Sequence, residues 1–241
     1  KDLWYSQVLE IDNEFLNLRK EAIDLLAEWN GEMSIYLPQP LLFYTWAAQF
    51  LKMVMQDEIG KNVNWFNSVN SNFLERVLRN INGASAWCDI KQTSKLETCE
   101  EISSKALDNA LVAITNKYGE DIKKWLWGNY HKAYFSDNVL GKYPIISYLT
   151  NIVFEISGGD DTLSMNRAIS STNNNYNVNY GSTLRIIIDF SDNANNFFSI
   201  PTGQSGHFLS KHYDDFTNLW LRNEYVKIPL FEDEILNKKI D

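Results

Sequence analysis

The sequence predicts an α+β fold in which helices fill the first half of the chain and strands the second. Over most of residues 1–127, apolar side chains recur at spacings of three and four, as on one face of an amphipathic helix. Residues 128–241 instead contain β-branched runs, alternating segments, loops and one short helical pattern. Helices that precede the strands, instead of alternating with them, favour α+β over α/β. No internal repeat is found, so we expect residues 1–241 to form a single region.

Two long helices are expected before residue 60. The first ends at Asn30-Gly31, because glycine favours the end of a helix. Its apolar stripe comprises Val8, Ile11, Phe15, Leu18, Ala22, Leu25 and Trp29. The second follows the loop marked by Pro38 and Pro40 and ends near Gly60. Its stripe comprises Leu41, Tyr44, Ala48, Leu51 and Met55.

A third and a fourth helix are expected between residues 70 and 119. The stripe of the third consists of Phe73, Val77 and Ile81, and Asn82-Gly83 ends this helix. The fourth opens with a capping box, in which the Thr98 hydroxyl accepts from the Glu101 amide and the Glu101 side chain reaches back. Its buried stripe comprises Ile102, Ala106, Ala110 and Ile114, and Gly119 ends it.

Strands are expected after residue 150. Residues 162–169 alternate polar and apolar side chains like a strand, and the Asn-rich residues 173–177 predict a solvated loop. The run Ile186-Ile187-Ile188, within the candidate strand 183–190, is typical of a strand buried on both faces. The last expected elements are a strand at 197–200 and a short helix at 214–222.

Composition excludes several classes of protein. The chain carries 31 acidic and 22 basic side chains, for a net charge of -9, and its pI is near 4.9. Nucleic-acid binders need clustered basic residues, so we expect no nucleic-acid partner. Apolar residues make up 44% of the chain, which argues against disorder. No segment reaches the roughly 18 apolar residues of a membrane span, and no signal peptide opens the sequence.

Cys88 and Cys99 are the two cysteines of the chain, and their spacing matches neither a metal knuckle nor a redox C-x-x-C. A disulfide between them would close a short loop, contribute about 3 kcal/mol and imply an oxidising compartment. Two buried free thiols fit the spacing equally well, so the sequence leaves both states open.

Two segments near the C-terminus invite a catalytic or metal-binding interpretation that their spacing does not support. Ser205 lies in a G-Q-S-G-H segment, but a nucleophile elbow needs a final Gly where His207 stands, so a tight turn is expected. His207 and His212 are separated as H-x4-H and lack a general-base Glu, so we expect solvated loop residues and no metal site.

His131 and the paired carboxylates are also expected to be structural. A lone histidine among aromatic residues, such as His131, is usually packed and hydrogen-bonded. Adjacent acidic residues in loops usually form turns or caps. The pairs in this sequence are Asp160-Asp161, Asp189 with Asp192, and Asp214-Asp215.

Several motifs, in one order along the chain, resemble those of a known family. A G-Q-S-G turn, an H-Y-x-D segment and a Trp are formed by Gly203, Gln204, Ser205, Gly206, His212, Tyr213, Asp215 and Trp220. Upstream lie Trp127-Gly128 with His131, the turn at 158–162, Arg185 with Asp189, and Cys88 with Cys99. This series resembles the penicillin acylase (penicillin amidase) family over nearly the whole chain.

The resemblance implies the C-terminal portion of an αββα sandwich, the fold of N-terminal-nucleophile hydrolases, which autocleavage divides into two chains. In that family the larger chain starts with Ser, whose hydroxyl attacks the amide while its own α-amine acts as base through a water. A backbone amide and an Asn side chain form the oxyanion hole. These groups lie upstream of all the matched motifs, so the resemblance implies that this chain is the C-terminal part of the large subunit, without a catalytic residue. It also implies that Ser205 is not the nucleophile.

The function implied is hydrolysis of the acyl-amide bond of a small molecule, either a penicillin or a related acyl-amide. The alternatives are an acyl-homoserine lactone acylase and a non-catalytic binding or scaffold domain. The chain alone is expected to be inactive, with the rest of the large subunit and the small subunit as partners. We expect no cofactor, no membrane contact and a periplasmic or secreted location. Strands taken from a larger sheet keep an unpaired edge, so the isolated chain should self-associate or need the missing segments.

Overall fold

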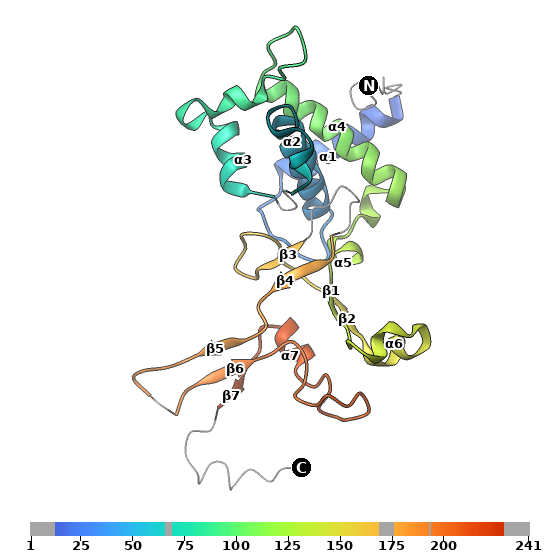
Figure 1. Ribbon diagram of the computed structural model, residues 1–241, viewed down its shortest axis with the longest axis vertical. Helices are drawn as coiled ribbons and strands as arrows, with labels where there is room; N and C mark the ends of the chain where they lie inside the picture. The colour runs from blue at the N-terminus through green and yellow to red at the C-terminus, as the bar shows by residue number, and fades with distance from the viewer. Residues whose placement is uncertain (1–12, 66–68, 169–175, 193, 229–241) are drawn as a thin grey trace. The chain divides into compact units, whose positions relative to one another are not determined.

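The computed structural model describes residues 13–65, 69–168, 176–192 and 194–228. The chain forms two compact units, which we describe separately (Figure 1). Unit 1 comprises Lys1–Lys132 and Ser157–Asn179, and unit 2 comprises Ala133–Ile156 and Tyr180–Asp241. Both helices and strands are present, as expected for an α+β fold.

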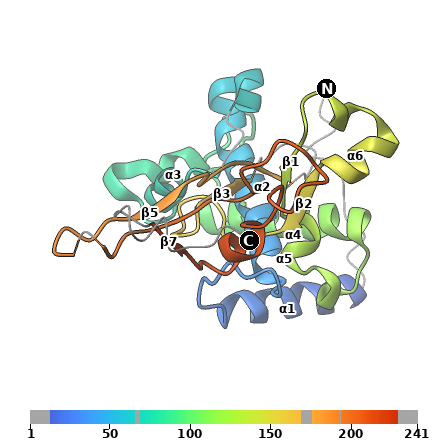
Figure 2. The same ribbon diagram turned by 90° about the horizontal axis from the view of Figure 1, so that it is seen from below.

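Among the described residues of unit 1, the helix α2 lies at the centre of the hydrophobic core. The α2 helix contacts both α1 and α4, and these helices lie side by side in Figures 1 and 2. Shorter helical segments and the strand β3 complete the unit, and β4, which pairs with β3, runs across the boundary between residues 179 and 180. The elements are α1 (Asn13–Ala27), α2 (Gln39–Ile59), η1 (Gly60–Trp65), α3 (Ser71–Leu78), η2 (Ile81–Cys88), α4 (Cys99–Tyr118), η3 (Ile122–Lys124), α5 (Trp127–Tyr130), β3 (Asn166–Ala168) and β4 (Val178–Gly181).

Local sequence explains where these helices begin. Pro40 stands in the first turn of α2, where its missing N–H costs no hydrogen bond. Most of α2 is apolar on all sides, and nine of its residues are buried, which is typical of a core helix. Thr98 and Glu101 form both hydrogen bonds of the predicted capping box at the start of α4. None of the described helices is long and apolar enough to cross a membrane.

In the part of unit 2 that the structure describes, there are two small sheets and two short α-helices. Strands β1 and β2 pair with each other, and a second, antiparallel sheet has the strand order β5-β6-β7. In this second sheet Ile186 lies opposite Phe198, which in turn lies opposite Val226. The elements are β1 (Lys132–Phe135), η4 (Leu140–Lys142), α6 (Pro144–Thr150), β2 (Ile152–Glu155), β5 (Arg185–Ile187), β6 (Phe197–Ser199), α7 (Thr217–Leu221) and β7 (Val226–Lys227).

Two expectations about element boundaries were wrong. Ile81 lies outside the third helix, in η2, because Asn80, Asn82 and Gly83 adopt positive φ values that an α-helix does not allow. The strand expected at 162–169 is limited to Asn166–Ala168 in the described chain, and residue 169 lies outside the described residues. The Thr162 hydroxyl instead donates to the backbone carbonyls of Gly159, before it, and Ser164, after it, and these local bonds replace a strand ladder there.

The expected burial of the isoleucine run was also wrong. Ile186, Ile187 and Ile188 are 51, 48 and 53% exposed, and the strand covers Arg185–Ile187 instead of residues 183–190. Ile186 and Ile187 point to opposite faces of the sheet, so the described residues leave both faces of β5 partly uncovered. The helix expected at 214–222 is present as α7, which begins later, at Thr217.

Candidate functional site

A buried stack of aromatic rings surrounds Trp127 and His131 in unit 1. Both side chains are fully buried, and their rings stack with centroids 4.4 Å apart. Tyr44, from α2, stacks on Trp127 at 5.2 Å. His131 Nε2 lies 3.0 Å from the carbonyl oxygen of Asn166, in β3. His131 is therefore packed and hydrogen-bonded, as the sequence predicts.

The same stack is tied to two neighbouring loops through backbone groups. Trp127 Nε1 donates to the carbonyl of Gly158 at 3.0 Å, and the Gly128 amide donates to the carbonyl of Ile35 at 3.0 Å. Gly158 has a φ of 96°, and a Cβ there would lie 2.0 Å from the Ser164 carbonyl oxygen. The W-G-x-x-H and Gly-Asp motifs thus meet at one point of unit 1, although they are about 30 residues apart.

Asp160 is a buried carboxylate beside this stack. Its side chain is 2% exposed, and the backbone amides of Ala168 and Val69 partly stabilise its charged form. Arg167 Nε lies 3.6 Å from Oδ1, and the Asp160 amide donates to the Tyr44 hydroxyl. Burial raises the pKa of Asp160 to about 6, because it penalises the charged form more than Arg167 stabilises it. The sequence predicts only a turn at Asp160, because the contact of this residue with Tyr44 is made between distant segments.

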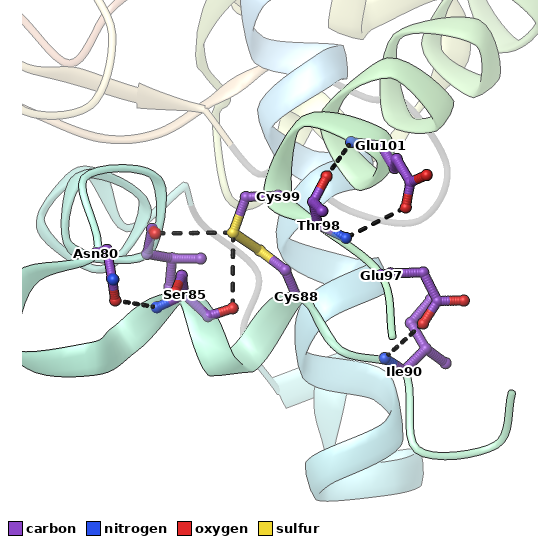
Figure 3. The surroundings of a disulfide bond; sticks show 9 residues. Asn80, Ser85, Cys88, Ile90, Glu97, Thr98, Cys99 and Glu101 are labelled. Atoms are coloured by element: carbon purple, nitrogen blue, oxygen red, sulfur yellow. Dashed lines mark hydrogen bonds between the residues drawn. A yellow bond between two sulfur atoms is a disulfide. The ribbon is translucent and has the colours of Figure 1, made fainter. Parts of the chain in front are cut away.

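Cys88 and Cys99 form a disulfide that joins η2 to the first turn of α4 (Figure 3). The structure therefore decides between the two states that their spacing left open, in favour of the bond. The Glu97 carboxylate, which lies nearby in Figure 3, accepts from the Ile90 amide at 3.1 Å and from the Thr93 hydroxyl at 2.8 Å. The disulfide and these hydrogen bonds hold both ends of the loop between the two cysteines.

The G-Q-S-G segment of unit 2 is a bent loop segment that lies against residues 212–213, and the described chain shows no local backbone hydrogen bond that would close the tight turn expected there. The Gly203 amide donates to the Tyr213 carbonyl at 2.8 Å, and the Ser205 amide donates to the His212 carbonyl at 2.9 Å. A Cβ at Gly203 would lie 1.9 Å from the His212 carbonyl oxygen, so the close approach requires glycine. Ser205 Oγ accepts from the His207 amide and does not lie on a strand-to-helix turn. Gln204 and Gly206 are exposed.

His212 and Asp215 form the one His–carboxylate contact of this loop in the described chain. His212 Nδ1 lies 2.8 Å from Asp215 Oδ2, and the His212 side chain is 53% exposed. Tyr213, between them, donates its hydroxyl to the Thr150 carbonyl, and partial burial raises its pKa. Over the described ranges, no three His, Cys, Asp or Glu side chains gather in a way that could hold a metal ion.

Arg185, Trp220 and Asp189 form the third group of motif residues, around β5 and α7. The Arg185 guanidinium lies 4.2 Å from the centre of the Trp220 ring and donates to the Trp220 carbonyl at 2.7 Å. Asp189 accepts from the hydroxyl and amide of Ser191 and from the Asn195 side chain. These hydrogen bonds lower the pKa of Asp189 to about 2.

The motif residues thus hold backbone segments in place, and none of those described combines a nucleophile with an adjacent base. Ser205 Oγ contacts a backbone amide, His131 contacts a carbonyl, and His212 contacts a carboxylate. A hydrolase needs a nucleophile activated by a base and preorganised donors for the oxyanion. The expectation that the catalytic groups lie outside this chain stays a prediction.

Comparisons with known proteins relate the whole chain to one family. The acyl-homoserine lactone acylase QuiP of Pseudomonas syringae pv. tomato is 26% identical over 225 residues, which is 89% of this chain and 27% of that protein. The proteins of the same name from Pseudomonas fluorescens and Pseudomonas aeruginosa are 23 and 21% identical, over 88 and 91% of this chain and 26 and 28% of their own lengths. The chain therefore spans about a quarter of these relatives.

A solved structure and a family model agree with this relation. The thermostable penicillin G acylase of Alcaligenes faecalis matches with a TM-score of 0.53 and 18% identity, over 98% of this chain and 43% of that one. This likeness shows the fold, an α+β portion of the penicillin acylase type. The family model described as penicillin amidase matches residues 2–237. The chain therefore belongs to the penicillin amidase family, whose members hydrolyse amide bonds.

Proposed function

We propose that this chain is the C-terminal part of the large subunit of an amide hydrolase that cleaves the acyl-amide bond of a small molecule. The observation that carries the proposal is the family match over residues 2–237, in a chain that spans 27% of a full-length relative. The remaining length is enough to hold the nucleophilic Ser, its α-amine and the oxyanion-hole Asn that the resemblance implies.

In this proposal the chain supports the active site instead of performing the chemistry. The buried contacts of Trp127, His131 and Arg185 fix the loops and strands of each unit through backbone hydrogen bonds. Rigid supporting elements matter because a catalytic group must be held within a fraction of an ångström of its productive position. We expect the 241-residue chain alone to hydrolyse no amide.

For the substrate, we propose N-acyl-homoserine lactones ahead of penicillins. The support is that the curated relatives reported above are all named acyl-homoserine lactone acylases, at 21–26% identity, whereas the penicillin G acylase is 18% identical. Both substrate classes carry an acyl group on an amide nitrogen, so the same nucleophile and oxyanion hole can act on either.

The test is to purify the natural polypeptide that contains this sequence, determine its mass and first residue, and assay release of homoserine lactone and of the penicillin nucleus. A longer polypeptide, processed to start with Ser, should turn over an acyl-homoserine lactone faster than a penicillin. Its Ser205→Ala variant should keep full activity. Turnover by the 241-residue chain alone, abolished by Ser205→Ala, would overturn the proposal. A natural polypeptide of 28.0 kDa without turnover would favour the binding or scaffold alternative.

We also propose a periplasmic or secreted location. The Cys88–Cys99 disulfide supports it, because such bonds persist in oxidising compartments. Thiol counting on the natural protein, denatured without reductant, should detect no free thiol at these positions. A count of two would remove the argument for the location.

A further inference from the structure

A cavity of about 520 Å³ opens between α3 and η2, and we call it the α3–η2 cavity. All the residues that line it lie between positions 70 and 87, within unit 1. Its walls are therefore formed by one short stretch of the chain and do not depend on unit 2. Its volume falls in the range of sites that hold small molecules.

The wall formed by η2 has a fixed and unusual backbone conformation. Asn80, Asn82 and Gly83 have φ values of 52, 59 and 79°, in the left-handed region that residues other than glycine rarely adopt. The Asn80 side-chain oxygen accepts from the Ser85 amide at 3.2 Å (Figure 3). The disulfide of Cys88 anchors the end of η2. A wall that is fixed in advance reduces the entropy lost when a ligand binds.

Arg76 gives the α3–η2 cavity a positive charge. Among the described residues, it is the one arginine that has no ion-pair or hydrogen-bond partner. Its neighbour Arg79 pairs instead with Glu75, at 3.4 Å. None of the described lining residues is acidic, in a chain whose net charge is -9. A guanidinium presents two parallel N–H donors that fit a carboxylate, so we expect the ligand to carry one.

Three asparagines and two aromatic rings also line the cavity. The Asn70 side-chain oxygen accepts from the Phe73 amide at 2.9 Å, which leaves its amide nitrogen as a donor. Asn72 and Asn82 are exposed, and each side chain offers a donor and an acceptor. Phe73 and Trp87 pack edge to face, with ring centroids 5.0 Å apart. Hydroxyl groups can pair with such amides, whereas a fatty or aryl carboxylate would cover them without giving them partners.

We propose that the α3–η2 cavity binds a sugar acid, a hexose ring that bears one carboxylate, either free or at the end of a polysaccharide. The carboxylate pairs with Arg76, the ring hydroxyls bond to the asparagine side chains, and the C–H face of the sugar packs on Trp87. Each kind of lining side chain then has a matching group on the ligand. Binding here requires no amide hydrolysis, so this inference is independent of the proposed function.

The test is a saturation-transfer NMR titration of the natural polypeptide with D-glucuronate and D-galacturonate. At least one of them should bind with a Kd on the order of 1 mM, as expected for a small polar ligand. The corresponding neutral sugar, which lacks the carboxylate, and benzoate, which lacks the hydroxyls, should bind at least about tenfold more weakly. Trigalacturonate that binds more tightly than galacturonate would identify the end of a polysaccharide as the ligand, and equal binding would identify the free sugar acid.

Variants of the natural polypeptide place the binding at this cavity. Arg76→Gln should weaken it at least about tenfold, whereas Arg79→Gln, outside the lining, should not. Arg76→Lys keeps the positive charge that favours the last turn of α3 but loses the two-donor geometry, so it should also weaken binding even if the glutamine variant fails to fold. Trp87→Ala should weaken binding, and Trp87→Phe should retain most of it.

Three results would overturn the proposal. The first is that neither sugar acid binds. The second is that the neutral sugar or benzoate binds as tightly as the sugar acid. The third is an affinity that neither Arg76 variant changes.

Discussion

Individual side chains decide how the loops of this protein are held. His131, Trp127 and Arg185 each contact a backbone carbonyl from a segment distant in sequence. Such contacts satisfy buried polar groups and fix the position of the loop at the same time. Asp160 differs from them, because it is a buried carboxylate that lies beside the Arg167 guanidinium.

Asp160 should make the stability of unit 1 depend on pH. Its folded pKa, about 6, lies above the usual value of an aspartate, so its favourable contribution is present below about pH 4 and is lost as the pH rises through 6. We therefore compare the unfolding free energy of Asp160→Asn with that of the wild type at two pH values. The difference should favour the variant by about 2 kcal/mol more at pH 8 than at pH 4. Urea unfolding at both pH values measures this. The exposed neighbour Asp161→Asn is the control, and an equal gain there would contradict the assignment.

Gly203 should tolerate no side chain, whereas Gly206 should. A Cβ at Gly203 would overlap the His212 carbonyl oxygen, and nothing lies within 4 Å of a Cβ at Gly206. We expect Gly203→Ala to destabilise the 203–213 loop by about 2 kcal/mol and Gly206→Ala to leave it unchanged. Limited proteolysis of this loop distinguishes the two variants. Equal cleavage rates would mean that the close approach is absent in solution.

At the scale of elements, local signals and covalent links fix the helices of unit 1. The capping box starts α4, and the disulfide attaches that first turn to η2. The capping box and the disulfide act on the same helix end through different residues. Either one can therefore be removed while the other remains. Residues of α4 such as Ile102 and Ile114 are fully buried, which links this helix end to the core.

Removing the cap should lower the unfolding free energy less than removing the disulfide does. Thr98→Ala deletes the hydroxyl that accepts from Glu101 and should lower the unfolding free energy by about 1 kcal/mol. Thr98→Ser keeps a hydroxyl and should restore most of the loss. Urea denaturation of the three proteins provides the values. A serine variant as unstable as the alanine variant would show that packing of the methyl group matters instead.

The disulfide should contribute about 3 kcal/mol, as for other loops of this size. The double variant Cys88→Ala, Cys99→Ala should lose that amount in oxidising buffer. Addition of a reductant should destabilise the wild type and leave the double variant unaffected. The same response to reductant in both proteins would place the effect elsewhere in the chain.

At the scale of the whole molecule, apolar burial is unevenly divided. The main core cluster lies in unit 1, around α2, whereas unit 2 exposes many large apolar side chains, on η4 and α6 as well as on β5. Hydrophobic burial is the dominant favourable term in folding, so stability should be uneven too.

In the isolated 241-residue chain, unit 2 should therefore open more easily than unit 1. We expect backbone amides of α2 and α4 to exchange by global unfolding and those of β5, β6 and β7 to exchange at least about tenfold faster. We expect the amides of β1 and β2 also to exchange faster than those of α2 and α4. Uniform protection across both units would show that the chain is stable without further polypeptide.

The sequence by itself determined the four longer helices of the first half of the chain, the capping box and the family. These depend on residues close together in the chain, or on an ordered series of motifs, so periodicity and local hydrogen bonding are enough to predict them. Ile81 shows the limit, because left-handed residues beside it ended the helix one turn earlier than its apolar spacing indicated.

Only the tertiary structure decided which distant residues meet and which apolar faces stay bare. It joined Cys88 to Cys99, placed Asp160 against Tyr44, and left the isoleucines of β5 half exposed. The spacing of two cysteines does not report the distance between them, and a β-branched run does not specify the strand that covers it. Both depend on how separate segments pack in space.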